Sequence, residues 1–421
     1  MRVLIVGQGG REHAIASKLA DNPTVEKLFA APGNAGIAEL ATCEPIAAAD
    51  VQGVADFAER ESIDLTVVGP EAPLVAGLVD EMSMRGLRVF GPDRAAALIE
   101  GSKAWAKQLC VRAGIPAPVS ESFTAYEPAR AYLDALKPPY VIKADGLAAG
   151  KGVTVAEDLD TAERALRASL VDRAFGEAGT RVLVEEFLEG REVSAIAITD
   201  GRTVLPMALA QDYKRAGDGD TGPNTGGMGA YSPVPFIDDG LRDAIVRDVL
   251  EPTVGAMADE GVRYRGVLYA GLMVTPDGPK VLEFNCRLGD PETQAILPRL
   301  GSDLGELLLA TVEGNLSNYG VRWREEACVT VVLASGGYPG EHETGFPIEG
   351  LDEAAAHDDA FVFHAGTALR NGRVVTAGGR VLAVSALGSS LPEARKRAYE
   401  AASAISFRGM HYRKDIGAEI G

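Results

Sequence analysis

The chain has 421 residues, 46% of them hydrophobic, so it is long enough for two or three domains that each bury a substantial core. Its formal net charge of −19 argues against non-specific binding to nucleic acid, which requires a basic surface. No apolar run is long enough to span a membrane, and MRVLIVG is too short for a signal peptide, so we expect a cytoplasmic protein that binds neither nucleic acid nor membranes.

The first segment, residues 1–101, alternates apolar strands with helical patterns. RVLIVG is followed by REHAIASKLADNP, and IDLTVVG is followed by PEAPLVAGLVDEM. This alternation is typical of βαβ units, so we expect a Rossmann-like parallel sheet.

The second segment, residues 102–325, contains hairpin-like strands and two helical stretches at about 121–190, which we expect to form a small mobile lid. Longer strands and helices follow, interrupted by QDYKRAGDGDTGPNTGGMGAYSP at 211–233. We interpret this stretch as structureless, and a loop of that length inside a compact domain is uncommon unless it serves a site.

The third segment, residues 326–421, combines strands, a predicted Asn371-Gly372 hairpin and the helical stretch LPEARKRAYEAASAI. These elements predict a terminal α+β domain. The fold class expected for the whole chain is therefore α/β and α+β, with several domains.

The cysteines are scattered along the chain without CxxC spacing, so neither a disulfide framework nor a zinc site is indicated. We expect them to be reduced and mostly buried. They are Cys43, Cys110, Cys286 and Cys328.

The sequence IKADGLAAGKGVTV, residues 142–155, places Lys143 before a run of glycine and alanine. It is not a Walker A motif, because Gly146 to Gly150 is one residue short and Gly152 stands where serine or threonine should bind magnesium. One alternative is a glycine-rich hairpin whose N–H groups close over phosphates, with Lys143 reaching in. The other is a plain flexible turn, which this segment alone slightly favours.

GQGGREH, residues 7–13, follows the first strand, where N–H groups and a helix N-terminus can bind an anion. A nicotinamide dinucleotide is disfavoured, because Glu12 replaces the third glycine of GxGxxG and no acidic ribose partner ends the second strand. The Arg11 fork suits a phosphate monoester, and the alternative is a tight turn with a solvated arginine. PGN at 32–34 and GPEAPL at 69–74 also follow strands, where parallel sheets bind ligands.

KVLEFNCRLGDPE, residues 280–292, is predicted to be a strand with period-two alternation that places Glu283, Asn285 and Arg287 on one face. A carboxylate and an amide oxygen are hard ligands that magnesium accepts while it stays bound to nucleotide phosphates. The arginine can neutralise a carboxylate or a phosphate. The alternative is a salt-bridged sheet surface, which we disfavour.

The same pattern directs Leu282, Phe284 and Cys286 into the core, so Cys286 is interpreted as a small buried hydrophobe and not as a nucleophile. Asp290-Pro291 predicts a helix N-cap with proline at the first helical position.

RVLVEEFLEGREVS, residues 181–194, changes from apolar to acidic at Glu185 and Glu186, with Glu192 a short turn later. Such a hinge can offer backbone groups to an adenine edge, and Glu192 can accept from ribose hydroxyls. Exposed acids at a strand end are the alternative, which this segment alone favours.

Lys103, Lys143, the glycine loop, the EEFL hinge, Glu192 and ExN occur in the order found in ATP-grasp ligases. The resemblance is closer to one family, the phosphoribosylamine–glycine ligases, whose signatures these motifs resemble over essentially the whole chain: GGREHA, PGN, GPEAPLV, EGSK, KADGLAAGKGV, EEFLEG, QDYKR, DGDTGPNTGGMGAYSP, YAGLM, EFNCRLGDPE, LASGGYPG, FHAGT and GGRVL.

The resemblance implies a substrate domain at 1–101, an ATP-grasp domain at 102–325 and a C-terminal domain at 326–421. It implies that ATP, 5-phosphoribosylamine and glycine give glycinamide ribonucleotide, ADP and phosphate through glycyl phosphate, with Mg²⁺ or Mn²⁺ as cofactor. It also implies a monomer whose partners are these small molecules, with a transient contact to the preceding pathway enzyme.

The resemblance also implies roles for individual residues. The implied ATP contacts are Lys103, Lys143, Gly150, Lys151, Gly152, Glu185, Glu186, Phe187, Leu188, Glu192, Arg215 and Asn224. The implied contacts of phosphoribosylamine and glycine are Gly10, Arg11, Glu12, Asn34, Pro70, Glu71, Asp212, Lys214 and Arg287. Glu283 and Asn285 would bind the metal, and Arg287, Lys143 and Asp212 would be catalytic.

Two positions depart from the family pattern. Tyr213 replaces the usual histidine of QDHKR, which puts any proton-transfer role there in doubt, and Leu288 replaces the phenylalanine of RFGDPE, which we interpret as a packing exchange. YAGLM offers no acidic ligand for a second magnesium. The alternatives are a bicarbonate-activating ATP-grasp carboxylase and a non-catalytic nucleotide-binding protein.

Overall fold

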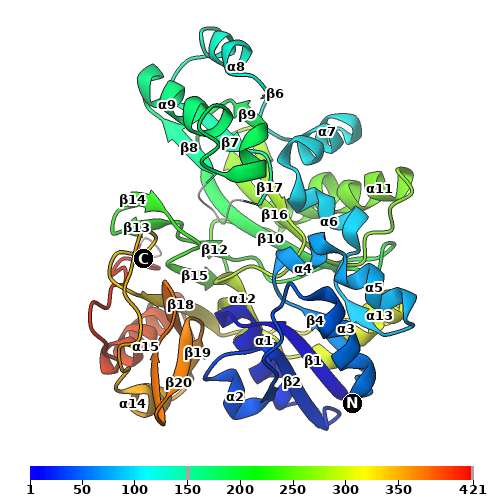
Figure 1. The fold of residues 1–421 in the computed structure, drawn as a ribbon, viewed down its shortest axis with the longest axis vertical. Coiled ribbons are helices and arrows are strands. Elements are labelled where there is room, and N and C mark those ends of the chain that lie inside the picture. The colour runs from blue at the N-terminus through cyan, green and yellow to red at the C-terminus, as the bar shows by residue number, and fades with distance from the viewer. Residues whose placement is uncertain (148–151, 419–421) are drawn as a thin grey trace.

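The computed structural model describes residues 1–147 and 152–418 (Figure 1). Gly150 and Lys151, two predicted ATP contacts, lie outside the described residues.

The N-terminal segment forms a five-stranded parallel sheet in the order β3-β2-β1-β4-β5, as predicted. Its inner strands are apolar along nearly their whole length because helices cover the sheet. The strands are β1 (Arg2–Gly7), β2 (Lys27–Pro32), β3 (Thr42–Cys43), β4 (Leu65–Val68) and β5 (Val89–Phe90). The helices are α1 (Gly10–Ala20), α2 (Ile37–Leu40), α3 (Val51–Arg60), α4 (Glu71–Ala76), α5 (Leu78–Met84) and α6 (Arg94–Gly101).

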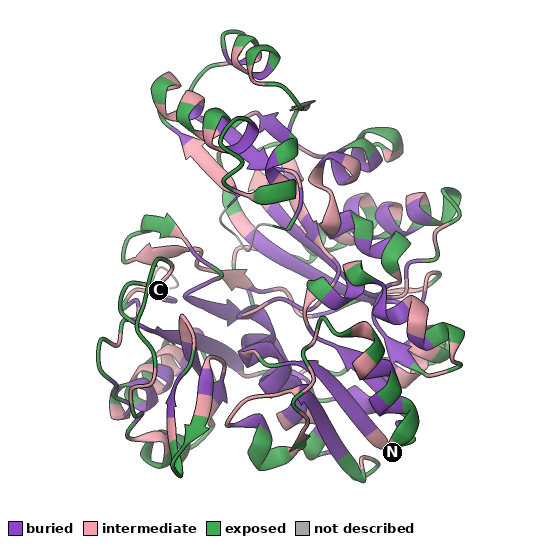
Figure 2. Ribbon diagram, viewed as in Figure 1, coloured by how far each residue is buried: buried purple, intermediate pink, exposed green. Residues whose placement is uncertain are grey.

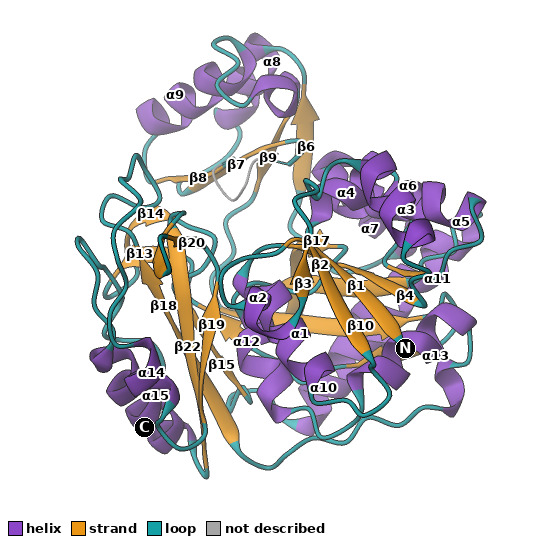
Figure 3. Cartoon of the chain, turned by 60° about the horizontal axis from the view of Figure 1, so that its bottom comes forward, coloured by secondary structure: helices purple, strands orange, loops and turns teal. Residues whose placement is uncertain are grey.

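The predicted lid is a four-stranded sheet in the order β6-β9-β7-β8, with two helices on its outer side (Figure 3). A cluster of buried residues from these helices and strands gives this four-stranded sheet its own core, and the mobility of the lid stays a prediction. The strands are β6 (Ser120–Phe123), β7 (Tyr140–Ala144), β8 (Val153–Ala156) and β9 (Val182–Glu185). The helices are α8 (Tyr126–Leu133) and α9 (Leu159–Leu170), followed by the 3₁₀ turn η1 (Gly176–Thr180).

The central sheet is antiparallel, in the order β11-β10-β16-β17. Its strands are β10 (Arg191–Thr199), β11 (Val204–Pro206), β16 (Gly266–Thr275) and β17 (Gly278–Asn285). The helices of this region are α7 (Lys103–Ala113), α10 (Asp239–Ile245), α11 (Glu251–Asp259), α12 (Glu292–Ile296) and α13 (Leu304–Glu313). Short helical turns are η2 (Val246–Leu250), η3 (Leu297–Arg299) and η4 (Leu316–Asn318).

A second antiparallel sheet, in the order β12-β15-β18-β22-β19, carries α15 on one face. Its strands are β12 (Gln211–Asp212), β15 (Gly229–Ser232), β18 (Ala327–Ala334), β19 (Ala360–His364) and β22 (Arg380–Gly388), and its helices are α14 (Leu351–Ala355) and α15 (Leu391–Ala404). The predicted hairpin joins β20 (Thr367–Arg370) to β21 (Arg373–Thr376). Asn371 and Gly372 have φ of 51° and 73°, as a type I′ turn requires.

The interpretation of residues 211–233 as structureless is wrong. This stretch contains β12 and β15, and between them the hairpin of β13 (Arg215–Gly217) and β14 (Thr221–Asn224). Glycine, aspartate and proline have low strand propensity, and the pairing partner of β15 is β18, about a hundred residues later in the chain. The predicted boundary at 325/326 thus separates strands of one sheet, and the domain limits stay a prediction.

Buried residues are concentrated in the strands of the central and C-terminal sheets, whereas the lid helices expose one side (Figure 2). Cys43 is half-buried and the other cysteines are buried, all of them free, as predicted. Within residues 1–147 and 152–418, no helix has the length and apolar character that crossing a membrane requires.

Candidate active site

A cavity of about 1050 Å³ is lined by side chains from all three segments of the chain. Arg11 and Glu71 come from the N-terminal segment, Glu283 comes from β17, and Arg380 begins β22. Charged groups of both signs that converge on one concave surface are typical of a binding or catalytic site. We therefore treat this cavity as the candidate active site.

Most of the predicted site residues lie on this cavity. They are Arg11, Pro70, Glu71, Lys103, Lys143, Gly152, Glu185, Glu186, Phe187, Leu188, Glu192, Asp212, Lys214, Arg215, Asn224, Glu283, Asn285 and Arg287. Of the predicted residues that the structure describes, Gly10, Glu12 and Asn34 are not in its lining.

Strand β17 supplies Glu283 and Asn285, which lie half-buried on the cavity wall. Phe284 and Cys286 point into the core, as predicted. The alternation is broken at Leu282, which was expected in the core: Gly271 pairs with Glu283 but the next residue of β16 pairs with Val281.

This irregularity is a β-bulge, and it turns Leu282 toward the cavity. Val281 takes the core position instead and is 1% exposed. The prediction for Leu282 is therefore wrong, because a strict period of two cannot anticipate an inserted residue. At the bulge, the Leu282 carbonyl accepts a hydrogen bond from Lys143 Nζ at 2.9 Å, which helps to fix the direction of that side chain.

Glu283 is held in its charged form. Burial alone would raise the pKa of its carboxyl group, but the nearby ammonium groups of Lys214, Lys103 and Lys143 lower it below the usual value. An ionised carboxylate beside an amide oxygen suits a hard divalent cation. Among the described residues, no cluster of three or more His, Cys, Asp or Glu side chains could hold a metal. A pair of this kind fits magnesium, because magnesium takes few protein ligands and completes its shell with water and phosphate oxygens.

Glu185 at the end of β9 lies between two lysines. Its Oε2 is 2.7 Å from Lys143 Nζ, and its Oε1 is 3.3 Å from Lys107 Nζ. Because Glu185 is 1% exposed, the alternative of an exposed acid at a strand end is wrong for this residue. The neighbouring Glu186 is half-buried, and its Oε1 accepts from the Val119 N–H.

Lys107 is a site residue that the sequence reasoning missed. It lies one helical turn after Lys103 on α7, and this i,i+4 spacing was the available signal. Its Nζ donates to the Val281 carbonyl at 2.9 Å, while Lys103 Nζ donates to the Gly146 carbonyl at 3.0 Å. Burial lowers the pKa of Lys107 to about 8, against the opposing charge of Glu185.

Lys214 pairs with one carboxylate and is influenced by the charge of a second. Its Nζ is 2.6 Å from Glu192 Oε2. Burial opposes its charge, but Glu192 and Asp212 outweigh that effect and hold the pKa of Lys214 well above its usual value. Burial raises the pKa of Asp212 to about 8; Lys214 opposes the shift, while Glu292 adds to it.

The Arg287 guanidinium contacts two carboxylates. Its Nε is 3.2 Å from Glu71 Oε2, and its Nη2 is 3.2 Å from Glu100 Oε1. Glu100 was also missed, although it opens the EGSK motif; it is buried and accepts from the Cys286 N–H at 2.8 Å. Burial alone would lower the pKa of Arg287, but Glu100 and Glu71 raise it above its usual value, so the guanidinium is fixed in direction and keeps its positive charge.

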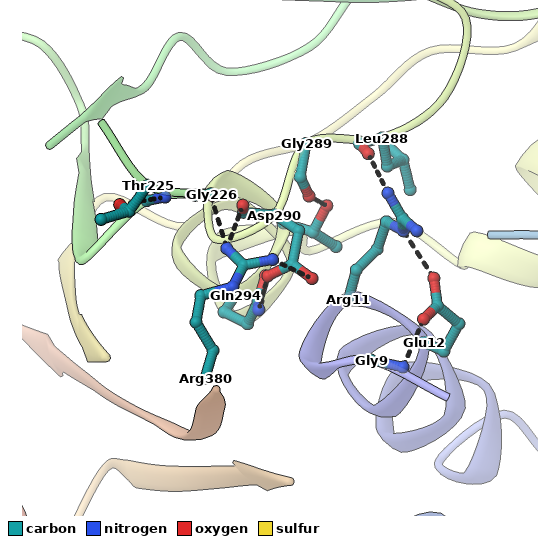
Figure 4. A network of polar contacts seen from close by, with 12 residues as sticks. Gly9, Arg11, Glu12, Thr225, Gly226, Leu288, Gly289, Asp290, Gln294 and Arg380 are labelled. Carbon is teal, nitrogen blue, oxygen red and sulfur yellow. Dashed lines mark hydrogen bonds and ion pairs between the residues drawn. The ribbon is translucent and has the colours of Figure 1, made fainter. Parts of the chain in front are cut away.

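The N-terminal loop is held from within by Glu12. Its Oε2 accepts from the Gly9 N–H at 2.5 Å and its Oε1 accepts from Arg11 Nε at 2.5 Å (Figure 4). Arg11 Nη1 donates to the Leu288 carbonyl at 3.1 Å. Since Arg11 is only 6% exposed, the alternative of a solvated arginine is wrong.

Asn34 is also engaged in loop contacts. Its Nδ2 donates to the Gln8 and His364 carbonyls at 2.8 and 2.7 Å, and its Oδ1 accepts from the Gly36 N–H. These contacts hold the PGN turn against the first loop and against β19. Asn34 and Glu12 therefore position the loop that presents Arg11.

Asp290 does not cap a helix with its side chain, contrary to expectation. The N-cap residue of α12 is Pro291, one residue later. The Asp290 carboxylate accepts from Gln294 Nε2 at 2.7 Å and lies 3.1 Å from Arg380 Nη2, and Arg380 Nη1 donates to the Gly226 and Asp290 carbonyls (Figure 4). The Asp290 carboxylate pairs with Arg380 and does not cap the backbone N–H groups of α12. Arg380 was missed, because nothing local in GGRVL indicates a partner ninety residues earlier.

Neither of the two departures from the family pattern lies in the cavity lining. The Tyr213 hydroxyl accepts from the Gly417 N–H at 2.9 Å, on the C-terminal segment. Leu288 is buried in an apolar cluster with Leu304 and Leu308, in agreement with a packing exchange.

Comparisons with known proteins agree along the whole chain. Family models match in three parts: the phosphoribosylglycinamide synthetase N domain at residues 1–100, the ATP-grasp (A) domain at 101–293 and the C domain at 328–419. The phosphoribosylamine–glycine ligase of Pseudomonas aeruginosa is 55% identical over 420 residues, covering 99% of this chain and 97% of that protein.

Solved structures show the same fold. The phosphoribosylamine–glycine ligase of Thermotoga maritima has a TM-score of 0.86 at 35% identity, covering 99% of this chain and 100% of that one. The biotin carboxylase domain of the Hydrogenobacter thermophilus 2-oxoglutarate carboxylase has a TM-score of 0.76 at 15% identity, covering 98% and 91%. The second likeness is one of fold alone.

Proposed function

The chain belongs to the phosphoribosylglycinamide synthetase family, and we propose that its large cavity is where glycine is activated by ATP and then joined to phosphoribosylamine. It is an ATP-dependent ligase of purine biosynthesis. The observation that carries the assignment of the site is that Glu283 and Asn285 line the same cavity as Lys103 and Lys143.

The first half-reaction makes glycine reactive. A carboxylate is a poor electrophile, so one glycine carboxylate oxygen attacks the γ-phosphorus of ATP, the bond to ADP breaks, and glycyl phosphate forms. In phosphoryl transfer the protein contributes little covalent chemistry. It positions the reactants and neutralises their charge. Lys103 and Lys143 neutralise the phosphate oxygens, with Lys143 held in direction by Glu185 and the Leu282 carbonyl.

The metal site consists of Glu283 and Asn285. Bound Mg²⁺ or Mn²⁺ would neutralise phosphate charge as the γ-phosphoryl group is transferred. Glu283 keeps its negative charge for this purpose because the surrounding ammonium groups lower its pKa.

The nucleoside end of ATP lies at the hinge of residues 185–188. The backbone of this hinge binds the adenine edge, and Glu192 accepts hydrogen bonds from the ribose hydroxyls. Arg215 and Asn224 contact the nucleotide from the β13–β14 hairpin. Gly152 lines the same cavity and contacts the phosphates. The other two predicted contacts, Gly150 and Lys151, lie outside the described residues.

The second half-reaction forms the amide. The phosphoribosylamine nitrogen attacks the carbonyl carbon of glycyl phosphate, a C–N bond forms, phosphate leaves, and the nitrogen loses one proton. Arg287 stabilises the acyl phosphate oxygens, because its direction is fixed by Glu71 and Glu100. Asp212 and Lys214 orient the glycine.

Phosphoribosylamine occupies the side of the cavity at the N-terminal sheet. Arg11, Pro70 and Glu71 contact it, and Gly10, Glu12 and Asn34 shape the loops behind them. Loops at the carboxyl ends of parallel strands are where such sheets bind ligands.

An isotope experiment tests this mechanism. Glycine labelled with ¹⁸O in its carboxylate should transfer one ¹⁸O to the released phosphate, because the acyl phosphate bridge oxygen comes from glycine. Phosphate without label would contradict the intermediate. ADP release that depends on bicarbonate and not on glycine would instead support a carboxylase.

We further propose that the enzyme works as a monomer in the cytoplasm, with a transient contact to the enzyme that makes phosphoribosylamine. Sedimentation analysis of the purified protein at micromolar concentration would reveal a stable dimer if this proposal is wrong.

A further inference from the structure

The β13–β14 hairpin carries two proposed nucleotide contacts but has little to stabilise it. Its strand ladder has only two residue pairs, Arg215–Asn224 and Gly217–Thr221, and one side-chain hydrogen bond joins the strands, from Arg215 Nη1 to the Gly222 carbonyl at 2.9 Å. Residues 218–223 are all exposed. An isolated two-stranded hairpin is at best marginally stable in water, so the order of this one must come from elsewhere.

The C-terminal clamp, which we define as residues 411–417, supplies the missing contacts. The Lys414 N–H donates to Asp218 Oδ1 at 2.7 Å, and the Gly219 N–H donates to Asp415 Oδ2 at 2.8 Å. His411 Nε2 lies 2.8 Å from the Ala216 carbonyl. Among the described residues, each hydrogen bond or ion pair that leaves the hairpin, residues 215–224, ends on this clamp.

Arg413 is the centre of the clamp. It is 1% exposed, and its Nη1 donates to Asp220 Oδ1 at 2.6 Å and to the Arg215 carbonyl at 3.1 Å. Its Nε and Nη2 donate to Asp415 at 2.8 and 2.6 Å. The guanidinium carbon lies 4.8 Å from the centre of the Tyr213 ring. A buried arginine with this many directed contacts fixes the start of β13 through the Arg215 carbonyl and the turn after it through the Asp220 side chain.

The clamp is itself fixed to the C-terminal domain. Arg395 of α15 donates to the Ile416 carbonyl at 2.9 Å and to the Lys414 carbonyl at 2.7 Å. The Tyr399 hydroxyl donates to the Arg413 carbonyl at 2.8 Å. The hairpin therefore rests on a rigid support that extends back to a long helix.

We propose that the C-terminal clamp, through Arg413, holds the β13–β14 hairpin in place and so positions Arg215 and Asn224 for the nucleotide. This inference rests on the proposed function, because it takes the nucleotide to lie beside those two side chains. Arg413 is a positioning residue: it does not line the cavity, whereas Arg215, Asp220 and Asn224 do.

The test compares Arg413→Met with Arg397→Met in the full-length protein. Arg397 makes a comparable set of contacts, to Asp359, the Leu387 carbonyl and Glu393, but none to the hairpin. Hydrogen exchange of the amides at 216–222 should become about tenfold faster or more in Arg413→Met and remain unchanged in Arg397→Met. The KM for ATP should rise by about tenfold, equivalent to one lost interaction, while the KM for glycine stays within twofold.

Asp218→Ala keeps the test decisive if Arg413→Met does not fold. Asp218 is exposed and lies outside the cavity lining, and its loss removes the bond from the Lys414 N–H. We expect the same two changes, smaller in size. Unchanged exchange in both variants would overturn the clamp, and faster exchange with an unchanged KM for ATP would overturn its role in positioning. If the unaltered enzyme does not ligate glycine, the proposed function fails, and exchange still reports separately on the clamp.

Discussion

Replacing Glu185 with glutamine should destabilise the protein strongly, although the two side chains have nearly the same shape. The carboxylate is the anion between Lys107 and Lys143, with N–O distances of 3.3 and 2.7 Å. A neutral amide leaves two buried ammonium groups without a counter-charge. Removing one member of a buried ion pair costs about 3–5 kcal/mol.

The lower end of that range applies, because Lys107 has a pKa of about 8 and can release its proton at modest cost. A loss of about 3 kcal/mol corresponds to a fall in Tm of about 6–12 °C, at about 2–4 °C per kcal/mol for a unit of 150–250 residues. The KM for ATP should rise as well, since Lys143 loses the partner that fixes its direction.

The matched control is Glu186→Gln at the adjacent position. Glu186 uses Oε1 to accept from the Val119 N–H, and a glutamine carbonyl can accept the same bond. Thermal unfolding of the two variants without nucleotide at pH 7, followed by circular dichroism, makes the comparison. If Glu185→Gln unfolded within 2 °C of Glu186→Gln, by the same scale of about 2–4 °C per kcal/mol, the buried charge cluster would contribute little and the reasoning would be refuted.

Three further predictions follow from the site and the core. Glu283→Ala should lower kcat by about 10³-fold or more, since a metal supplies several kcal/mol of charge stabilisation, with an unchanged circular dichroism spectrum; near-normal turnover would contradict the metal assignment. Lys107 binds its proton more weakly in the native protein (pKa about 8) than in the unfolded chain (10.5), so its contribution to stability rises between those pH values. In urea unfolding, the free energy of unfolding of the wild type should therefore rise relative to that of Lys107→Met between pH 8 and pH 10. A constant difference between the two free energies would refute the shifted pKa. Leu288→Phe should destabilise by about 1–3 kcal/mol with activity retained, because the void beside Leu288 is only about 10 Å³; equal unfolding midpoints would show that the core adapts.

The parts of the fold that the sequence predicted are those encoded by nearby residues. The apolar runs of β1 and β4 and the helices after them specify a parallel sheet, and Asn371-Gly372 specifies its hairpin. The lid strands and helices were likewise predicted within their expected range.

The parts that it did not predict depend on residues far apart in the chain. The bulge at Leu282 exists because β16 pairs with β17 in an irregular register, and no local pattern of β17 encodes that. Strand β15 is ordered by β18, and the Asp290–Arg380 ion pair joins α12 to β22.

The candidate site followed the same rule. Single side chains on one strand face, such as Glu283 and Asn285, could be assigned from alternation. Lys107 and Glu100 could not be assigned with the same ease, because their importance comes from the partners Glu185 and Arg287 that tertiary packing brings to them.

The C-terminal clamp has a consequence for synthesis on the ribosome. Translation proceeds from the N-terminus, and domains tend to fold in the order in which they emerge. Residues 411–417 are synthesised nearly two hundred residues after the hairpin at 215–224, so the hairpin gains these contacts only after that stretch of chain has been made. We predict that a nascent chain stalled before residue 411 does not retain ATP, whereas the released full chain does; nucleotide retention by the stalled chain would show that the pocket forms without residues 411–417.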